Sequence, residues 1–129
     1  MHIPENLKYT SDHEWVMVES DKAKVGITDY AQDALGDVVF VDIPEVGKRV
    51  AVGETVTEVE STKSVSDIYA PLEGEIIEIN HDLDDSPELL NGDPYGEGWI
   101  FILQLDEAAS TENLLSANEY LSLIHISEP

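Results

Sequence analysis

Short runs of β-branched and aromatic residues, each interrupted by glycine, proline or a turn-forming polar residue, dominate this chain of 129 residues. Many such runs in succession favour a β-sandwich or barrel over a helical fold. The run at 38–41 (VVFV) is uniformly apolar, which predicts a strand buried on both faces. The other expected strands cover residues 14–19, 23–27, 65–70, 75–79 and 99–105, with further β-branched residues around Gly53.

Two short helices are expected at the periphery of these strands. Thr28 provides an N-cap for residues 29–35, and Gly36 ends that helix. Residues 86–92 (SPELLNG) contain a cap, a first-turn proline and a terminal glycine, which together predict one or two helical turns.

The C-terminal part of the chain predicts a longer helix, because Ser116 and Glu119 have the spacing of a capping box. Its expected apolar face consists of Leu114, Ala117, Leu121 and Ile124. Residues 1–124 are expected to form a single domain. Residues 125–129 (HISEP) are treated as a tail of uncertain origin, to which we assign no function.

The charge balance restricts the partners of this protein. There are 28 acidic and 6 basic residues, and the formal net charge is −22. Nucleic acid and anionic membranes are therefore unexpected partners, since both are bound through clusters of lysine and arginine. The acidity keeps the protein hydrated and favours partners with basic docking surfaces. The chain has no cysteine and does not start like a signal peptide, so cytoplasm is the expected location.

The sequence contains no motif for catalysis or for metal binding. His2, His13, His81 and His125 are scattered and form neither HxH nor HExxH, so we expect no zinc site. The acidic run 82–85 (DLDD) lacks the alternating ligands and the glycine of a calcium loop. We therefore expect a carrier or binding module rather than an enzyme.

Lys63 lies in residues 59–70 (VESTKSVSDIYA), between two β-prone runs. Its hydroxyl and carboxylate neighbours predict an exposed amine, and acylation of that amine would remove its charge. Taken alone, the spacing favours an ordinary surface lysine in a turn over a modified one. Gly47 and Gly74 flank this segment at a distance, and each could serve a turn that needs positive φ, although glycines are common in turns of every kind.

Several blocks of the sequence, in the same order, resemble the H protein of the glycine cleavage system, a lipoyl carrier protein. The blocks are 9–16 (YTSDHEWV), 25–31 (VGITDYA), 35–46 (LGDVVFVDIPEV), 59–70 (VESTKSVSDIYA), 74–80 (GEIIEIN) and 86–100 (SPELLNGDPYGEGWI). The resemblance implies a mainly β, lipoyl/biotinyl-type sandwich or flattened barrel with short peripheral helices and a C-terminal helix. It also implies that Lys63, at a hairpin tip, carries lipoic acid in amide linkage.

The resemblance implies a division of labour as well. The family's lipoyl arm takes an aminomethyl group from a pyridoxal-phosphate glycine decarboxylase and passes its carbon to a tetrahydrofolate-dependent aminomethyltransferase. A dihydrolipoyl dehydrogenase then reoxidises the arm, and a separate lipoylating enzyme attaches it. The chain itself is expected to be a monomeric carrier and no enzyme.

A surface cleft shields the loaded arm in this family. Glu14 and Asp67 match acidic positions near that cleft, where a carboxylate would hold the ammonium of the aminomethyl group. Read without the family, both are ordinary solvent-facing acids. Tyr30 replaces the histidine that is common in the family, which leaves the cleft contact of that position open.

Three alternatives stand beside this interpretation. Lipoyl domains of 2-oxoacid dehydrogenases usually have Asp-Lys-Ala at the tip, followed by a Pro/Ala-rich linker, whereas this chain has Thr62-Lys63-Ser64 and no such linker. Biotin carriers usually have methionine on both sides of the lysine. The third alternative is an unmodified acidic interaction module that has kept the fold.

Overall fold

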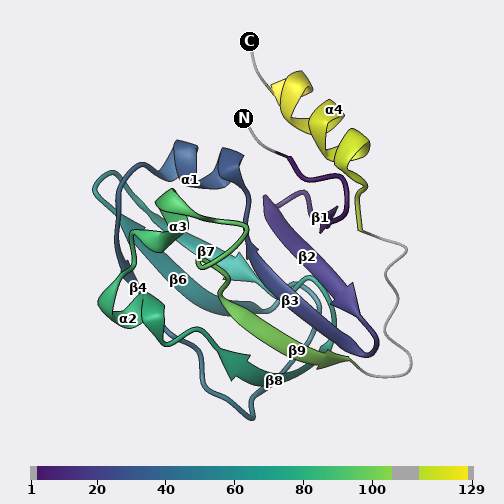
Figure 1. Cartoon of the computed structure of the whole chain (residues 1–129), viewed down its shortest axis with the longest axis vertical. Coiled ribbons are helices and arrows are strands. Elements are labelled where there is room, and N and C mark those ends of the chain that lie inside the picture. The colour runs from purple at the N-terminus through teal and green to yellow at the C-terminus, as the bar shows by residue number, and fades with distance from the viewer. Residues whose placement is uncertain (1–2, 106–113, 128–129) are drawn as a thin grey trace.

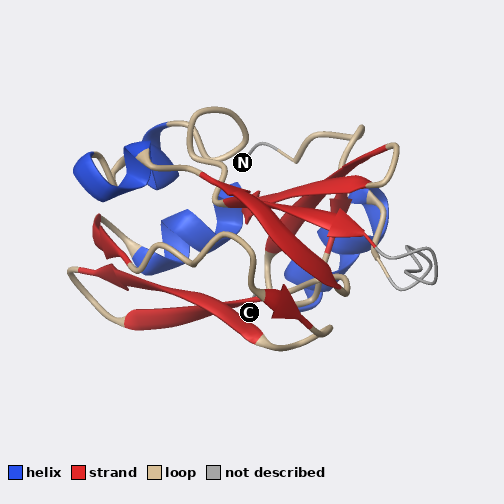
Figure 2. Ribbon diagram, turned by 90° about the horizontal axis from the view of Figure 1, so that it is seen from below, coloured by secondary structure: helices blue, strands red, loops and turns tan. Residues whose placement is uncertain are grey.

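The computed structural model describes residues 3–105 and 114–127, with side chains of the last helix described as far as Ile124. Two antiparallel sheets form separate layers (Figures 1 and 2). The strands are β1 (Lys8–Tyr9), β2 (Glu14–Glu19), β3 (Lys22–Ile27), β4 (Val38–Val41), β5 (Arg49–Val50), β6 (Thr55–Ser61), β7 (Val65–Tyr69), β8 (Gly74–Ile79) and β9 (Phe101–Leu105). The helices are α1 (Asp29–Leu35), α2 (Asp82–Asp85), α3 (Leu89–Gly92) and α4 (Ala117–Ser127).

The larger sheet has the order β1-β2-β3-β9-β8-β5, and the smaller sheet has the order β4-β6-β7. The β2–β3 and β6–β7 connections are hairpins, as the alternation of strand and turn residues predicts. The predicted mainly β sandwich with short helices and a C-terminal helix is confirmed.

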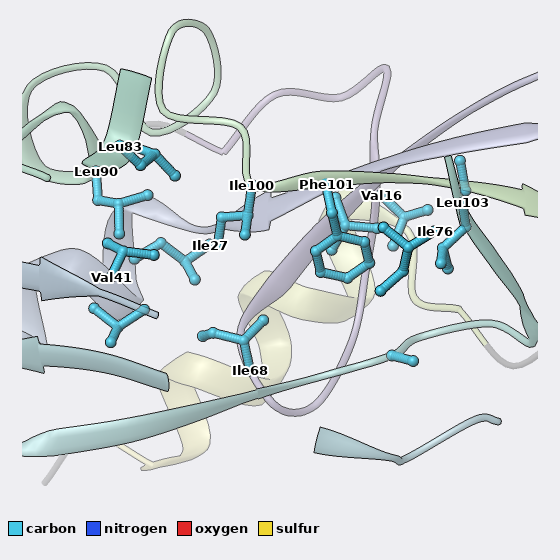
Figure 3. Close-up of a cluster of buried hydrophobic side chains, with 14 of the residues drawn as sticks. Val16, Ile27, Val41, Ile68, Ile76, Leu83, Leu90, Ile100, Phe101 and Leu103 are labelled. Carbon is cyan, nitrogen blue, oxygen red and sulfur yellow. The ribbon is translucent and has the colours of Figure 1, made fainter. Parts of the chain in front are cut away.

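The main core fills the space between the two sheets (Figure 3). Val25, Ile76 and Phe101 come from the larger sheet, and Val59 and Ile68 come from the smaller one; all are at most 4% exposed. Burying apolar surface from both layers contributes about 25 cal/mol per Å². This burial holds the small sheet, which carries Lys63, against the large one.

A second, aromatic cluster joins the N-terminal segment to α4. Tyr9 and Tyr120 are fully buried and stacked, with 4.9 Å between ring centroids. Tyr9 and Leu115 exchange two backbone hydrogen bonds, at 2.8 and 2.7 Å. Figure 1 shows α4 beside the start of the chain. The ends of the described chain are thus packed together.

The start of α4 has the predicted capping box. Ser116 N donates to Glu119 Oε1 at 3.0 Å, and Glu119 N donates to Ser116 Oγ at 3.2 Å. The buried face differs in one member, because Tyr120 is fully buried whereas Leu121 is only partly so. Helix α4 runs to Ser127, into the segment treated as a tail, and residues 128–129 lie outside the described residues.

The prediction that β4 is buried on both faces is wrong. Val38 and Val41 are buried, but Val39 is 55% exposed and Phe40 is 48% exposed. β4 is an edge strand, and a register shift between Val38 and Phe40 turns two consecutive side chains outward. The strand therefore shows neither the complete burial that its apolar run predicted nor a regular alternation of buried and exposed side chains.

The region after β8 is more helical than the sequence indicated. Asp82–Asp85 forms a single turn, α2, that buries Leu83, and α3 begins three residues later than the predicted segment 86–92. Strand β9 starts at Phe101, because Trp99 and Ile100 belong to the preceding loop. These short turns place α3 against α1, close to the lysine hairpin (Figure 1).

Candidate functional site

Lys63 lies at the tip of the β6–β7 hairpin, and its side chain is exposed. The turn is held by Ser61, whose hydroxyl accepts hydrogen bonds from Lys63 N at 3.1 Å and Ser64 N at 3.0 Å. The same hydroxyl donates to Ser64 O at 3.1 Å, and Ser61 N donates to that carbonyl at 2.8 Å. Because the Ser61 side chain pairs the backbone polar groups of the turn, it fixes the backbone of Lys63 and leaves the amine exposed to solvent.

The turn between α1 and β4 supports the hairpin tip from the side. Thr62 N donates to Asp37 O at 3.0 Å. A Cβ atom placed on Gly36 would lie 3.2 Å from Lys63 Cε and 3.3 Å from Cδ, so the lysine stem passes directly over this glycine. The tip is therefore braced by its own hydroxyl and by a neighbouring turn.

A cleft of about 220 Å³ lies beside the hairpin. Its wall is formed by the residues just before β2, by helix α1 and by the hairpin turn and β7. The lining residues are Asp12, His13, Ile27, Tyr30, Ala31, Ala34, Leu35, Ser64, Val65, Ser66 and Ile68. Tyr30, whose contact with the cleft the sequence left open, lines it. The lining is mixed in character, because it includes the apolar Ile27, Leu35 and Ile68 and the hydroxyls of Ser64 and Ser66.

Glu14 is 1% exposed and does not line this cleft. Its Oε2 accepts from Tyr69 N at 2.6 Å, and its Oε1 accepts from Thr10 Oγ1 at 3.2 Å. Burial raises the pKa of the Glu14 carboxyl to about 8, against the lowering effect of those two hydrogen bonds. The reading of Glu14 as a solvent-facing acid is wrong, and its carboxyl joins β2 of one sheet to β7 of the other.

Asp67 is exposed on β7, opposite Glu58 in the hairpin register, and it does not line the cleft either. The two carboxylates are therefore in different surroundings. Glu14 is buried and accepts a hydrogen bond from the backbone of Tyr69, whereas Asp67 is exposed to water.

His13 is the cleft residue that sequence reasoning missed, since it was weighed there only as a zinc ligand. Its backbone has φ 68°, a left-handed conformation that is uncommon outside glycine. Its Nδ1 shares a hydrogen bond with Tyr120 Oη at 2.8 Å, and its ring lies 4.7 Å from that of Tyr30. Thr28 Oγ1 lies 2.7 Å from the same Tyr120 oxygen. Burial lowers the pKa of His13, which favours the neutral imidazole at the cleft wall.

The two flanking glycines have different roles. Gly47 has φ 94°, so the expected positive φ is confirmed. Gly74 is not among the positive-φ residues, and that expectation is wrong for it. It begins β8, where a Cβ atom would collide with the carbonyl oxygen of Gln104 on β9. Close strand packing, rather than a turn, requires glycine at position 74.

No group of three or more His, Cys, Asp or Glu residues within the described parts of the chain has a metal-binding arrangement. Across the same residues, the helices are all too short or too polar to cross a membrane.

A small two-sheet β domain with one exposed lysine at a braced hairpin tip has the architecture of a lipoyl- or biotinyl-type carrier. Comparison with known proteins narrows this class. The chain belongs to the glycine cleavage H-protein family, whose model matches residues 7–126. The predicted family is therefore confirmed, and with it the choice over the lipoyl domains of 2-oxoacid dehydrogenases.

Individual relatives agree with the family assignment. The glycine cleavage system H protein of Thermus thermophilus is 55% identical over 124 residues, which cover 96% of this chain and 97% of that protein. The H protein of Aeromonas salmonicida is 54% identical over 124 residues, covering 95% and 96%. A crystal structure of the H protein from Mycobacterium marinum superposes with a TM-score of 0.88 at 45% identity, covering 95% of this chain and 99% of that one.

Proposed function

We propose that this protein is the lipoyl carrier of a glycine cleavage system and that Lys63 is the attachment site. One observation carries the proposal: in a chain of the H-protein family, Lys63 occupies a hairpin tip whose backbone is fixed and whose amine is exposed. An amine that is to be acylated by another protein must be accessible and presented on a defined backbone. The tip has both properties.

The surroundings of Lys63 fit an attached lipoyl group. The amine is primary and exposed, its neighbours Thr62 and Ser64 are small, and the cleft of about 220 Å³ begins at Ser64. The bound group would supply the redox-active sulfurs that this cysteine-free chain lacks. The apolar residues of the cleft, such as Ile27 and Leu35, would exclude water from whatever enters it.

The partners follow from this role. They are a pyridoxal-phosphate glycine decarboxylase, a tetrahydrofolate-dependent aminomethyltransferase, a dihydrolipoyl dehydrogenase and a lipoylating enzyme. A tethered aminomethyl cargo has a high effective concentration at each docked partner. The net charge of −22 favours basic docking surfaces on those enzymes. The monomeric state, the cytoplasmic location, and the absence of intrinsic enzyme activity and of nucleic-acid or membrane binding stay predictions.

We retain Glu14 and Asp67 as proposed acidic contacts for the ammonium of the aminomethyl cargo, with unequal access. Asp67 is exposed and lies four positions beyond Lys63. Glu14 already accepts two hydrogen bonds, so a cationic cargo would have to approach it beside Tyr69 and compete with that amide. A charge-assisted hydrogen bond contributes about 1.5–3 kcal/mol, and Glu14 would have to ionise against the effect of its burial to form one.

Intact mass measurement after incubation with lipoate, ATP and a lipoate ligase tests the proposal. One added lipoyl group is expected, and peptide mapping should place it on Lys63. Lys63→Arg keeps the positive charge but cannot form the amide, so this variant should fold normally and remain unmodified. Modification that survives the substitution would refute the assignment. An unmodified parent chain would favour the acidic interaction module.

A further inference from the structure

The side chain of Lys63 has a preformed support in the α1–β4 turn. Gly36 has φ 81° and ψ −157°, a conformation that is essentially restricted to glycine. A Cβ atom at position 36 would lie 3.2 Å from Lys63 Cε and 3.3 Å from Cδ, so a side chain there would crowd the lysine stem. The same turn binds the hairpin backbone through Asp37 O and Thr62 N, at 3.0 Å. We call Gly36 and Asp37 the lysine seat.

Asn91, which lies in helix α3, holds the lysine seat in place through hydrogen bonds of its side chain. Its Nδ2 donates to Gly36 O at 2.8 Å and to Gln32 Oε1 at 3.1 Å. Its Oδ1 accepts from Val38 N at 2.9 Å. One amide group thus bonds to the last turn of α1, to the seat and to the first residue of β4. An amide is the side chain that can donate twice and accept once in this arrangement.

We propose that Gly36 and Asn91 are positioning residues for lipoylation: Gly36 seats the stem of Lys63, and Asn91 fixes the seat, so that the amine reaches the modifying enzyme in a defined direction. This inference rests on the proposed function. In the reaction, Lys63 Nζ attacks the carbonyl carbon of an activated lipoyl donor such as an acyl adenylate. The new amide bond forms as the carbon–oxygen bond to the adenylate breaks, and the amine releases one proton. Gly36 and Asn91 act on the lysine and not on these reacting atoms.

Preorganisation is the physical reason for the expected effect. A free lysine side chain has many rotamers, and an enzyme that must select one of them loses binding energy. A seat that confines Cδ and Cε removes part of that cost before the enzyme binds. Loss of the seat should therefore raise the KM for the carrier more than it lowers kcat.

Asn91→Asp is the decisive variant, and Asn80→Asp is its matched control. Asn91→Asp keeps the acceptor for Val38 N but replaces both donors by an oxygen that repels Gly36 O. Asn80 has the same pattern elsewhere: its Nδ2 donates to Glu97 O and Trp99 O, both at 2.7 Å, and its Oδ1 accepts from Asp82 N at 3.2 Å. Asn80 is 4% exposed, so its substitution should destabilise the fold at least as much.

Two measurements are made on each folded variant. The first is kcat and KM for ligase-catalysed lipoylation, followed by intact mass. The second needs no enzyme: the nuclear Overhauser contact between the δ and ε protons of Lys63 and the α protons of Gly36. We expect Asn91→Asp to lower kcat/KM about tenfold, mainly through KM, and to lose the contact. Asn80→Asp should retain the contact and a kcat/KM within about twofold of the parent.

Equal loss of kcat/KM in the two variants would overturn the proposal, as would absence of the Overhauser contact in the parent chain. Gln32→Ala, which removes one acceptor of Asn91, replaces Asn91→Asp if that variant does not fold, and a smaller loss in the same direction is expected. If the parent takes no lipoyl group at Lys63, the proposed function fails. The Overhauser series then still decides whether Asn91 holds the seat.

Discussion

The hairpin tip and the aromatic cluster satisfy their polar groups in opposite ways. At the tip, Ser61 bonds to Lys63 and Ser64, within three residues along the chain and exposed to water. In the aromatic cluster, Tyr120 bonds to His13 and Thr28, which are 107 and 92 positions away. Exposed hydrogen bonds between near neighbours define the local backbone, and little stability is lost when they break. Buried hydrogen bonds between distant residues stabilise the whole fold. Substitutions should therefore affect modification at the tip and stability in the interior.

The largest expected effect concerns Glu14, which joins the two sheets. Because burial raises its pKa to about 8 from an ordinary value of 4.5, ionisation in the folded state is disfavoured. The folded protein should therefore lose stability as the pH rises from about 4.5 to 8, with no further loss above 8. Glu14→Gln keeps an acceptor for Tyr69 N and cannot ionise. Its unfolding free energy relative to the parent should increase on the order of 3 kcal/mol over that range.

Denaturant unfolding of parent and Glu14→Gln at pH 5 and pH 8.5 measures this difference. Glu19→Gln, at the exposed end of the same strand, is the control and should show no such trend. A difference between parent and Glu14→Gln that does not change with pH would show that the Glu14 carboxyl ionises normally in the fold.

The next effect concerns the aromatic cluster. Tyr120→Phe keeps the stacked ring but leaves Thr28 Oγ1 and His13 Nδ1 without their shared partner. Unpaired buried polar groups cost about 1–3 kcal/mol, so the unfolding free energy should fall by that amount. Tyr30→Phe is the matched control, because its ring also contacts His13 and no described hydrogen bond uses its hydroxyl. Equal losses in the two variants would mean that the hydroxyl of Tyr120 has no special role.

The smallest effect on stability is expected at the tip. Ser61→Ala removes three hydrogen bonds of the hairpin turn, but water replaces them because the site is exposed. The unfolding free energy should change by less than about 1 kcal/mol. Lipoylation should nevertheless slow a few-fold, since the Lys63 backbone is less defined. Ser61→Thr keeps the hydroxyl and should restore the rate; a stability loss as large as that of Tyr120→Phe would contradict the comparison.

The same contrast explains what the sequence could predict. The Thr28 cap, the Gly36 helix end and the Ser116–Glu119 box depend on neighbours within a few residues, and all three are present. The role of Lys63 came from resemblance, because its exposure alone is that of any surface lysine. The hydrogen bonds from Tyr69 to Glu14 and from Asn91 to Gly36 each join residues 55 positions apart, and no local pattern predicts them.

Wrong expectations had a similar origin. The apolar run in β4 predicted burial on both faces, but exposure there depends on its place at the edge of a sheet and on a register shift. Gly74 was expected in a turn, but its reason lies across the sheet at Gln104. Both depend on which strands become neighbours, and that is settled only by tertiary packing.

The hydrogen bond from Tyr69 N to Glu14 Oε2 has a consequence for amide exchange. Amides inside a β ladder exchange with solvent deuterium when neighbouring strands separate, whereas the Tyr69 amide donates to a side chain from the other sheet. Its deuterium uptake therefore records how often the two layers part, independently of fraying within either layer. A single backbone proton, six positions beyond Lys63, thus reports how firmly the hairpin that bears this lysine is held to the rest of the molecule.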